Sequence, residues 1–272
     1  MSRAGVLGSP ISHSLSPTLH RAGYAAAGLD EWSYTAHEVD EGGLAPFVGG
    51  LDESWRGLSL TMPLKVAAFD VAESVTDTAR AARAINTLVR TPTGWAADNT
   101  DVHGITAALR DAGVTSIDRA TIVGSGATAR SALLALSALG AAHVTIAART
   151  PARAEALRDV ADIRLDIVPL AEWSNTGARA IVSTLPGGDA NAAAAAFAGG
   201  DLAGVALLDV VYADWPTPLA REARSHGAIV VSGVEMLIHQ AARQFELFTG
   251  ESAPVAAMQT AGRTALGHSP DA

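Results

Sequence analysis

The sequence predicts an α/β protein made of two domains. From Arg119 onward, short apolar segments typical of β-strands alternate with alanine-rich segments typical of helices, which is the pattern of a parallel, doubly wound sheet. The chain before Asp101 also alternates, but in shorter units, which favours a separate domain. With 272 residues, 49% of them hydrophobic, the chain is long enough for two medium domains with packed cores.

The first domain is expected to span residues 1–101. Its predicted strands are 5–10, 32–39 and 57–61, and its first predicted helix is 17–28. Residues 86–99 have the pattern of a hairpin, with the turn marked by Pro92 and Gly94. A helix over 102–113 is expected to cross into the second domain.

The second domain is expected to span residues 102–235. A helix is predicted from a glycine motif at 124–129 to Leu139, and another over 151–161, where Pro151 suits a first helical position. Its predicted strands are 120–124, 143–148, 178–184, 205–211 and 228–233. Residues 236–249 have helical periodicity, and we expect the C-terminal helices of 236–272 to return to the first domain.

The composition excludes several classes of protein. Without cysteine, the chain has no disulfide framework, thiolate nucleophile or cysteine metal site. No window of ~18 residues is uninterruptedly apolar, and the N-terminus lacks the apolar core of a signal peptide. The net charge of −9 repels nucleic acid and anionic membranes. We therefore expect a cytoplasmic protein, monomeric or homodimeric, whose partner is a small-molecule substrate and neither nucleic acid nor a membrane.

The stretch GSGATA, from Gly124 to Ala129, has G-x-G-x-x-A spacing directly after a predicted strand and at the start of a predicted helix. Gly124 permits a tight turn, Gly126 lets a pyrophosphate approach the backbone, and Ala129 allows close packing of helix on strand. A glycine-rich turn alone is common in α/β proteins. Here strand, motif, helix and second strand follow in order, so we predict a Rossmann domain that binds a dinucleotide at the helix N-terminus.

The end of the second strand indicates which dinucleotide binds. NAD sites place an acidic residue about 20 residues after the motif, where it holds the ribose 2′-hydroxyl. Here the sequence is Ala148-Arg149-Thr150, with Arg153 one helical turn later and no acid in that place. The two guanidinium groups could simply lie in solvent, but they suit a 2′-phosphate. Because cations oppose the dipole at a helix N-terminus, a bound anion explains them better, and NADP is favoured.

Lys65, in the stretch GLSLTMPLKVAAF, is the only lysine among 19 lysine and arginine residues. A codon bias towards arginine would leave a surviving lysine to chance. Chemistry offers another reason, because a lysine pKa of about 10.4 falls readily on burial whereas arginine stays charged. A position that must give and take a proton can therefore use lysine and not arginine.

Other polar side chains follow predicted strand ends of the first domain, where the ligand crevices of open α/β sheets form. They are Ser14 and Ser16 in GSPISHSLSP, Thr61 in TMPLK, Asn86 in AINT, and Asn99 and Asp101 in DNTD. Taken singly, each has a structural explanation as well: Ser16 as a turn or cap residue, Asn86 as a strand end, and Asp101 as a helix N-cap.

Together these motifs resemble those of the shikimate dehydrogenase family through nearly the whole chain. The matching stretches are GSPISHSLSP, the T-x-P-x-K of Thr61 to Lys65, INT at 85–87, NTD at 99–101, GSGATA, ART, DVVY ending at Tyr212, TPLA, and the G-x-x-M-L-x-x-Q of Gly233 to Gln240. The segments WPTP and GWAADNTD look most like the actinobacterial branch of the family.

The resemblance implies NADPH-dependent reduction of 3-dehydroshikimate to shikimate, a step of aromatic amino-acid and chorismate biosynthesis. It implies that Lys65 and Asp101 form the acid–base pair at the reacting oxygen, with no metal required. The chemistry agrees, because an alkoxide that forms beside an ammonium group is stabilised and can then be protonated.

The resemblance also assigns the remaining positions. Ser14 and Ser16 match hydroxyls that hold the substrate carboxylate. The other substrate-binding matches are Thr61, Asn86, Tyr212 and Gln240, in addition to Lys65 and Asp101. The cofactor matches are Gly124, Gly126, Ala127, Thr128, Ala148, Arg149, Thr150, Arg153 and Gly233.

Two positions depart from the family pattern. The family's N-V-T before the proline is Ser59-Leu60-Thr61 here, so a shorter hydroxyl replaces an amide that commonly contacts the substrate. A contact of Ser59 with the substrate, direct or through water, is therefore an open question. The family's N-R-T is Ala148-Arg149-Thr150, which removes one polar contact to the cofactor. Two alternatives stay open: a relative that acts on quinate or aminoshikimate, and a non-catalytic module of this fold that senses the metabolite. Retention of Lys65 and Asp101 argues against the second.

Overall fold

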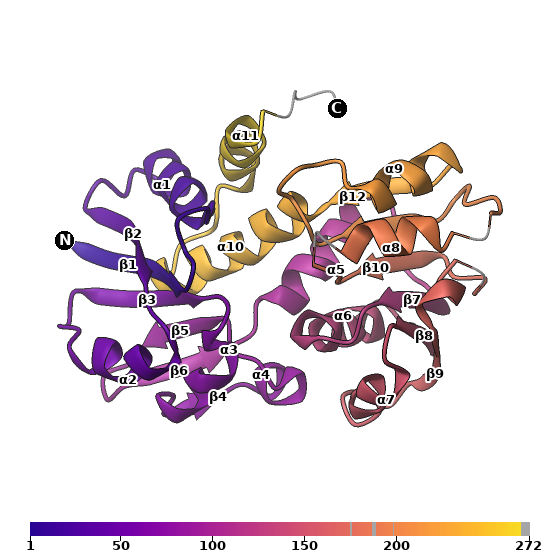
Figure 1. Ribbon diagram of the computed structural model, residues 1–272. Helices are drawn as coiled ribbons and strands as arrows, with labels where there is room; N and C mark the ends of the chain where they lie inside the picture. The colour runs from indigo at the N-terminus through magenta and orange to yellow at the C-terminus, as the bar shows by residue number, and fades with distance from the viewer. Residues whose placement is uncertain (175, 187–188, 198, 268–272) are drawn as a thin grey trace. The chain divides into compact units, whose positions relative to one another are not determined.

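The computed structural model describes residues 1–174, 176–186, 189–197 and 199–267. The chain forms two compact units (Figure 1): unit 1, which is Met1–Thr100 together with Leu237–Ala272, and unit 2, which is Asp101–Met236. The chain returns to unit 1 within one long helix, α10 (Gly233–Thr249). The predicted class, two α/β domains with C-terminal helices that return to the first, is confirmed.

Unit 1 is built on a six-stranded mixed sheet. Its strands are β1 (Ser2–Gly8), β2 (Trp32–Glu38), β3 (Trp55–Leu60), β4 (Ser74–Val75), β5 (Thr87–Arg90) and β6 (Trp95–Asp98). Their order in the sheet is β2-β1-β3-β5-β6-β4. β5 runs antiparallel to both β3 and β6, and the other pairs are parallel. The predicted hairpin is therefore β5 and β6.

Helices cover both faces of this sheet (Figure 1). One face carries α1 (Ser16–Ala26), the unit 1 part of α10, and α11 (Val255–Ala265), which packs on α1. The other face carries α2 (Glu41–Gly49), α3 (Leu64–Ala67), the 3-10 helix η1 (Ala68–Asp70) and α4 (Asp77–Ala82). Val6 lies in the core of the first face and its neighbour Leu7 in that of the second, as strand alternation requires.

Unit 2 is built on a six-stranded sheet in which all pairs are parallel. Its strands are β7 (Arg119–Val123), β8 (His143–Ala148), β9 (Arg164–Pro169), β10 (Ala180–Ser183), β11 (Ala206–Asp209) and β12 (Ile229–Ser232). The order β12-β11-β10-β7-β8-β9 reverses direction between β7 and β10. Dinucleotides bind at such a switch point, at the carboxyl ends of the strands.

Helices cover both faces of this second sheet as well. Ile122 and Leu133 lie in one core, formed with α5 (Asp101–Asp111), α6 (Ala127–Ala138), α7 (Pro151–Ala154) and the 3-10 helix η2 (Glu155–Leu157). Val123 and Trp173 lie in the other, formed with the 3-10 helix η3 (Leu170–Glu172), α8 (Ala190–Ala195) and α9 (Pro218–Ser225). Unit 2 is therefore a doubly wound Rossmann domain.

The structure corrects the predicted helix over 151–161. Only Pro151–Ala154 is α-helical, and after the 3-10 turn Glu155–Leu157 the chain bends towards β9. The Arg158 guanidinium holds this bend by donating to the carbonyl of Leu165 at 2.9 Å. Elements that the apolar patterns did not predict are β4, β9, α2, α8 and α9, and α10 begins at Gly233, three residues before the predicted start.

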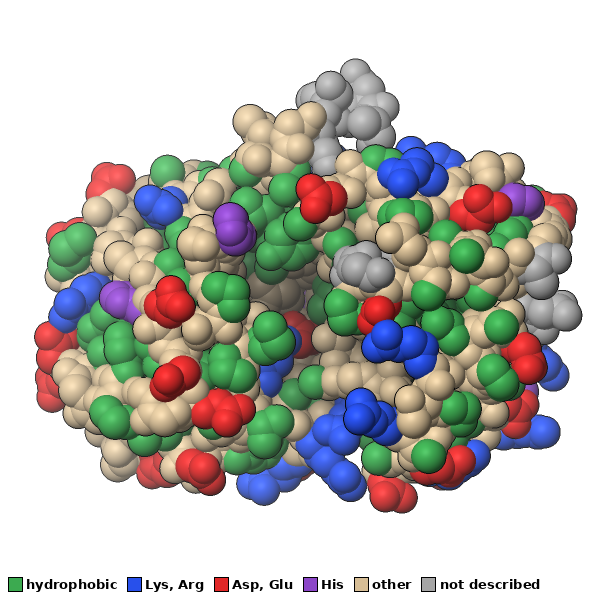
Figure 2. All heavy atoms as spheres, in the orientation of Figure 1, with side chains coloured by type: hydrophobic (Ala, Val, Ile, Leu, Met, Phe, Trp, Pro, Cys, Tyr) green, Lys and Arg blue, Asp and Glu red, His purple; other side chains and the backbone are tan. Residues whose placement is uncertain are grey.

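The surface of both units carries acidic side chains, as the net charge of −9 requires (Figure 2). Within the described ranges, no helix combines the length and apolar character needed to cross a membrane.

Candidate functional site

The predicted substrate residues of unit 1 lie along one edge of its sheet. Ser14 and Ser16 follow the carboxyl end of β1, and Thr61 and Lys65 follow that of β3. Because β5 is antiparallel to β3, the start of β5 lies beside the end of β3, and Asn86, just before β5, lies at the same edge. A hydrogen bond from the Leu60 N–H to the Asn86 carbonyl, at 2.7 Å, joins the two segments there. This edge is where open α/β sheets bind ligands.

Ser14 and Ser16 form the entry to α1. The Ser16 N–H donates to Ser14 Oγ at 3.3 Å, and Pro17 occupies the first turn of the helix. Ser14 is half-buried, whereas Ser16 is only 5% exposed. Ser14 is therefore the more accessible of the two hydroxyls.

Thr61 and Lys65 are placed by a turn after β3. The Thr61 N–H donates to the Leu7 carbonyl at 2.9 Å, and the Thr61 carbonyl accepts from the Leu64 N–H at 2.8 Å. The Thr61 methyl fills the space where Gly8 would carry a Cβ. The carbonyl of Lys65 accepts from the Ile85 N–H at 2.8 Å, which ties this turn to the segment that carries Asn86.

Asn86 and Gln240 form a buried amide pair. Asn86 Nδ2 donates to Gln240 Oε1 at 3.2 Å and to Thr100 Oγ1 at 3.0 Å. Asn86 Oδ1 accepts from the Thr100 N–H at 2.8 Å. Asn86 is 2% exposed and Gln240 is 7% exposed. The structure thus brings together two predicted residues that are 154 positions apart in the chain.

Ser59 belongs to this polar cluster and not to an exposed surface. It is 4% exposed, accepts from Tyr34 Oη at 2.6 Å and donates to Gln244 Oε1 at 2.7 Å. Its single hydrogen is therefore used inside the protein. Sequence reasoning did not single out Tyr34 or Gln244, although Gln244 follows Gln240 by four residues and so shares its face of α10.

Asp101 and Tyr212 belong to unit 2. Asp101 is 5% exposed and opens α5, where the helix dipole favours a carboxylate. Tyr212 follows β11 and is half-buried, and this burial raises the pKa of its phenol. Asn99, the other polar residue noted before α5, has a structural role, because its Nδ2 donates to the Ala84 carbonyl at 2.9 Å.

The glycine motif has the geometry that a pyrophosphate needs. Gly124 has a φ of 113° in the turn after β7, and a Cβ there would lie 2.5 Å from Thr184 Oγ1. Gly126 is the N-cap of α6, and a Cβ there would meet no described atom within 4 Å. Its backbone therefore faces open space. Ala127 is exposed and Thr128 half-buried in the first turn, where no described side chain caps the helix.

The arginine pair lies after β8. Arg149 and Arg153 are exposed, and α7 begins between them with Thr150 as its N-cap. The helix has only four α-helical residues, so the dipole argument for a bound anion is weaker than the sequence suggested. An acid is also present: Asp189 Oδ1 lies 2.9 Å from Arg149 Nη1.

Ala148 and Gly233 are both buried, in contrast to the arginines. Ala148 is the last residue of β8 and is 1% exposed. A Cβ at Gly233 would overlap the carbonyl of Val210, so the backbone contact alone requires glycine there. The structure accounts for Gly233 without a cofactor.

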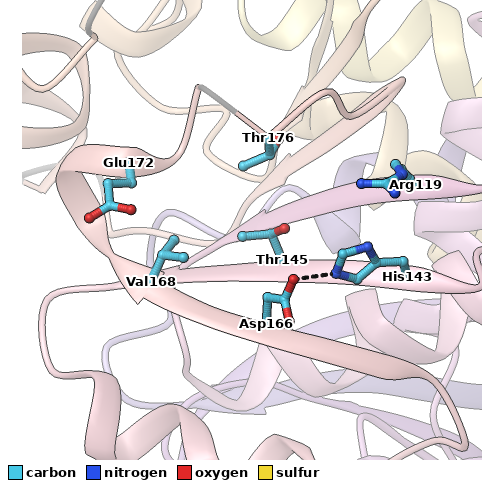
Figure 3. A pocket seen from close by; sticks show the side chains of 7 residues that line it. All are labelled: Arg119, His143, Thr145, Asp166, Val168, Glu172 and Thr176. Atoms are coloured by element: carbon cyan, nitrogen blue, oxygen red, sulfur yellow. Dashed lines mark hydrogen bonds and ion pairs between the residues drawn. The ribbon is translucent and has the colours of Figure 1, made fainter.

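A pocket of about 270 Å³ opens on unit 2, but it is not at the glycine motif (Figure 3). It is lined by Arg119, His143, Thr145, Asp166, Val168, Glu172 and Thr176. The pocket extends over one face of β7, β8 and β9, from Arg119 and His143 at the starts of β7 and β8 to Val168 near the end of β9. His143 Nε2 and Asp166 Oδ2 pair across it at 2.7 Å. None of the residues of the glycine motif lines it.

Three family models match the chain and together cover more than half of it. Residues 6–88 match the shikimate dehydrogenase substrate binding domain, residues 106–182 match shikimate / quinate 5-dehydrogenase, and residues 233–261 match the shikimate 5′-dehydrogenase C-terminal domain.

Known proteins match over almost the full length. The shikimate dehydrogenase (NADP(+)) of Symbiobacterium thermophilum is 35% identical over 278 residues, covering 96% of this chain and 94% of that protein. The crystal structure of Mycobacterium tuberculosis shikimate dehydrogenase has 41% identity and a TM-score of 0.88, with 97% of this chain and 100% of that chain covered. The Thermus thermophilus shikimate 5-dehydrogenase in complex with NADP(H) and shikimate has 32% identity and a TM-score of 0.85, with 97% and 100% covered.

Proposed function

The chain belongs to the shikimate dehydrogenase family, and we propose that it reduces 3-dehydroshikimate to shikimate with NADPH, in a reversible reaction whose proton is handled by Lys65 and Asp101. It is an NADP-dependent oxidoreductase by its family. The observation that carries the proposal is the hydrogen-bonded Asn86–Gln240 pair at the edge of the unit 1 sheet where Ser14 and Lys65 follow β1 and β3.

The substrate-binding roles follow from the donors at this edge. Serine hydroxyls at the start of α1 suit a carboxylate, so we assign the substrate carboxylate to Ser14 and Ser16. The ring hydroxyls are assigned to Thr61, Asn86 and Gln240, whose amides and hydroxyl can both donate and accept. Tyr212, with its half-buried phenol after β11, is the substrate residue assigned to unit 2.

Lys65 and Asp101 are the proposed proton-transfer pair. Reduction turns the ring ketone into an alkoxide, which the Lys65 ammonium stabilises and which the Lys65–Asp101 pair then protonates. Asp101 is the proposed partner of Lys65 in this proton transfer. Two hydrogen bonds support the pair. The Lys65 carbonyl accepts from the N–H of Ile85, the neighbour of Asn86, and the Asn86 side-chain oxygen accepts from the N–H of Thr100, the neighbour of Asp101.

The residues after β7 and β8 fit NADP. Open space at Gly126 and the uncapped first turn of α6 can receive the pyrophosphate, with Ala127 and Thr128 beside it. Arg149 and Arg153 can hold the 2′-phosphate next to Thr150 and Ala148. When bound, the nicotinamide supplies the hydride. The chain's own part is to hold the pyrophosphate and the 2′-phosphate at fixed positions.

The cellular setting belongs to the same proposal. We place the protein in the cytoplasm, as a monomer or homodimer that works on a small molecule without nucleic acid or a membrane. The net charge of −9 supports the exclusion of nucleic acid. Light scattering after size exclusion tests the oligomeric state, and a mass above that of a dimer would contradict it.

One assay tests the activity. Purified protein is given shikimate, quinate or aminoshikimate, each with NADP or NAD, and the absorbance of the reduced cofactor is followed. We expect fast turnover with shikimate and NADP only. Equal or faster turnover of quinate or aminoshikimate would move the substrate assignment to that compound. Absence of turnover with every combination would favour the metabolite-sensing module.

A further inference from the structure

A chain of buried side-chain hydrogen bonds runs through unit 1 from β2 to α10. Its five links are Tyr34 Oη to Ser59 Oγ (2.6 Å), Ser59 Oγ to Gln244 Oε1 (2.7 Å), Gln244 Nε2 to Thr87 Oγ1 (2.9 Å), Thr87 Oγ1 to Asn86 Oδ1 (2.7 Å) and Asn86 Nδ2 to Gln240 Oε1 (3.2 Å). None of the six side chains belongs to a residue more than 7% exposed. The proposed function uses only the last two, Asn86 and Gln240.

The direction of each bond on the Ser59 side is determined by a backbone carbonyl. Gln244 Nε2 also donates to the main-chain oxygen of Asn86 at 3.1 Å, and a carbonyl can only accept. Gln244 Oε1 must therefore face Ser59, and the Ser59 hydroxyl must donate to it. Tyr34 is then the donor in its bond to Ser59, so the hydrogen of Ser59 is not left for a ligand.

The direction on the Asn86 side follows in the same way. Thr87 accepts from Gln244, so its own hydrogen goes to Asn86 Oδ1, which the Thr100 N–H also approaches at 2.8 Å. Asn86 therefore turns Nδ2 towards Gln240 Oε1. Gln240 Nε2 in turn donates to the Leu237 carbonyl at 3.2 Å, which is the orientation that this requires. A flip of any one amide would bring two donors or two acceptors together.

We infer that Gln244, held by Ser59, is a positioning residue for substrate recognition: it sets the orientation of the Asn86–Gln240 amide pair without touching the substrate. This inference rests on the proposed roles of Asn86 and Gln240. It also gives Ser59 a function, since the hydroxyl at this position orients Gln244 instead of binding substrate. Gln244 has two contacts to the Asn86 segment, the Asn86 carbonyl and Thr87, so its loss removes both at once.

The effect of substitution should decrease with distance from Asn86 along the chain of bonds. Gln244→Met keeps the length of the side chain but cannot donate, and we expect the KM for shikimate to rise about tenfold. Ser59→Ala leaves Gln244 with its two donated bonds and should raise the KM less. Tyr34→Phe leaves the Ser59–Gln244 bond intact and should raise it least. The kcat and the KM for NADP should change less than about threefold in all three, because the proton-transfer and cofactor residues are untouched.

The experiment separates positioning from stability. Steady-state kinetics of the three variants are compared with Phe245→Leu, a control that removes part of a fully buried ring next to Gln244 on α10. Phe245→Leu should lower the midpoint of thermal unfolding and leave the KM for shikimate unchanged. The side-chain amide NMR signals of Asn86 and Gln240 should move in Gln244→Met and Ser59→Ala but not in Phe245→Leu. Ser59→Thr, which restores a hydroxyl, should return both the KM and the signals towards the wild type.

The outcomes distinguish this inference from the proposed function. Wild-type protein without turnover of shikimate contradicts the proposed function, and the amide signals then still report the orientation of the pair. A KM for shikimate within twofold of wild type in folded Gln244→Met, with unmoved amide signals, overturns the positioning role. If Gln244→Met does not fold, the KM for shikimate and the amide signals of Ser59→Ala are used in its place. An unchanged KM with unmoved signals in that variant also overturns the positioning role.

Discussion

Arg149 Nη1 lies 2.9 Å from Asp189 Oδ1, so the arginine proposed to hold the 2′-phosphate of NADP already has an anionic partner. The Arg149 side chain is 63% exposed and that of Asp189 is 24% exposed. Ion pairs at such a surface contribute only about 0–1 kcal/mol. A phosphate that binds Arg149 has to compete with this carboxylate.

Removing the carboxylate should therefore strengthen NADP binding. We expect Asp189→Asn to lower the KM for NADP by a factor of about 2–5, in line with the small free energy of an exposed pair. The KM for NAD, which has no 2′-phosphate, should not change and serves as the control. The measurement is the shikimate-dependent reduction of each cofactor at low ionic strength. A KM for NADP equal to that of the wild type would mean that Arg149 does not bind the phosphate.

Lys65 should be needed for the chemical step more than for binding. We expect Lys65→Ala to lower kcat by about 10²–10⁴ with a smaller change in the KM for shikimate, because proton transfer occurs in the transition state. Lys65→Arg keeps the positive charge but does not release a proton, so it should recover binding and not turnover. Steady-state kinetics with NADP check both. Wild-type kcat in either variant would remove Lys65 from the proton-transfer pair.

His20 should make unit 1 sensitive to acid. Burial lowers the pKa of His20 to about 3, and the nearby Gln244 side chain offsets only part of this lowering. Its ring stacks on that of Tyr34 with centroids 4.1 Å apart. Between about pH 6.5 and 3 the unfolded chain therefore binds a proton that the folded chain does not. The free energy of unfolding is therefore unaffected by His20 above about pH 6.5. Below that pH it falls by roughly 1.4 kcal/mol per pH unit.

The test is urea unfolding across that range of pH. His20→Leu fills a similar volume without titrating, so its free energy of unfolding should fall less steeply on acidification than that of the wild type. His13 is exposed, and His13→Gln is the matched control that should keep the wild-type slope. Parallel pH profiles for His20→Leu and wild type would contradict the neutral, buried form of His20.

Local patterns in the sequence were sufficient for the fold class and for the edge that carries the candidate site. The hairpin around Pro92 and Gly94 and the strand–motif–helix unit at Gly124 are both encoded within short segments, and both occur as predicted. The predicted helix over 151–161 is wrong because the length of this helix depends on where β9 pairs with β8. Local periodicity in the sequence does not contain that information.

The contacts that orient the site depend on the tertiary structure. Ser59 and Gln244 are 185 positions apart, and Asp189 follows Arg149 by 40 positions. Asp189 is therefore outside the short stretch after β8 in which an acidic residue is expected from the sequence. Ser59 looked like the loss of a substrate contact, because its bonds to Tyr34 and Gln244 exist only once β2, β3 and α10 are packed together.

Gly57 in β3 should tolerate no side chain, because its Cα faces the ring of Phe248 on α10. A Cβ at Gly57 would overlap Cδ1, Cε1 and Cγ of the Phe248 ring, which is rigid and cannot move away as the end of a flexible side chain could. Phe248 is itself 5% exposed in the core shared with Tyr34 and Phe245. Overpacking of this kind costs about 1–3 kcal/mol.

A double-mutant cycle isolates this contact. Gly57→Ala should lower the free energy of unfolding by about 1–3 kcal/mol, and Phe248→Ala should lower it by leaving a cavity. In the double variant, alanine at 248 lacks the Cγ, Cδ1 and Cε1 atoms that the new methyl group would meet, so the combined loss should be less than the sum of the two single losses. Urea unfolding of the four proteins measures the coupling. Additive losses would show that the loss in Gly57→Ala does not arise from a clash with the Phe248 ring.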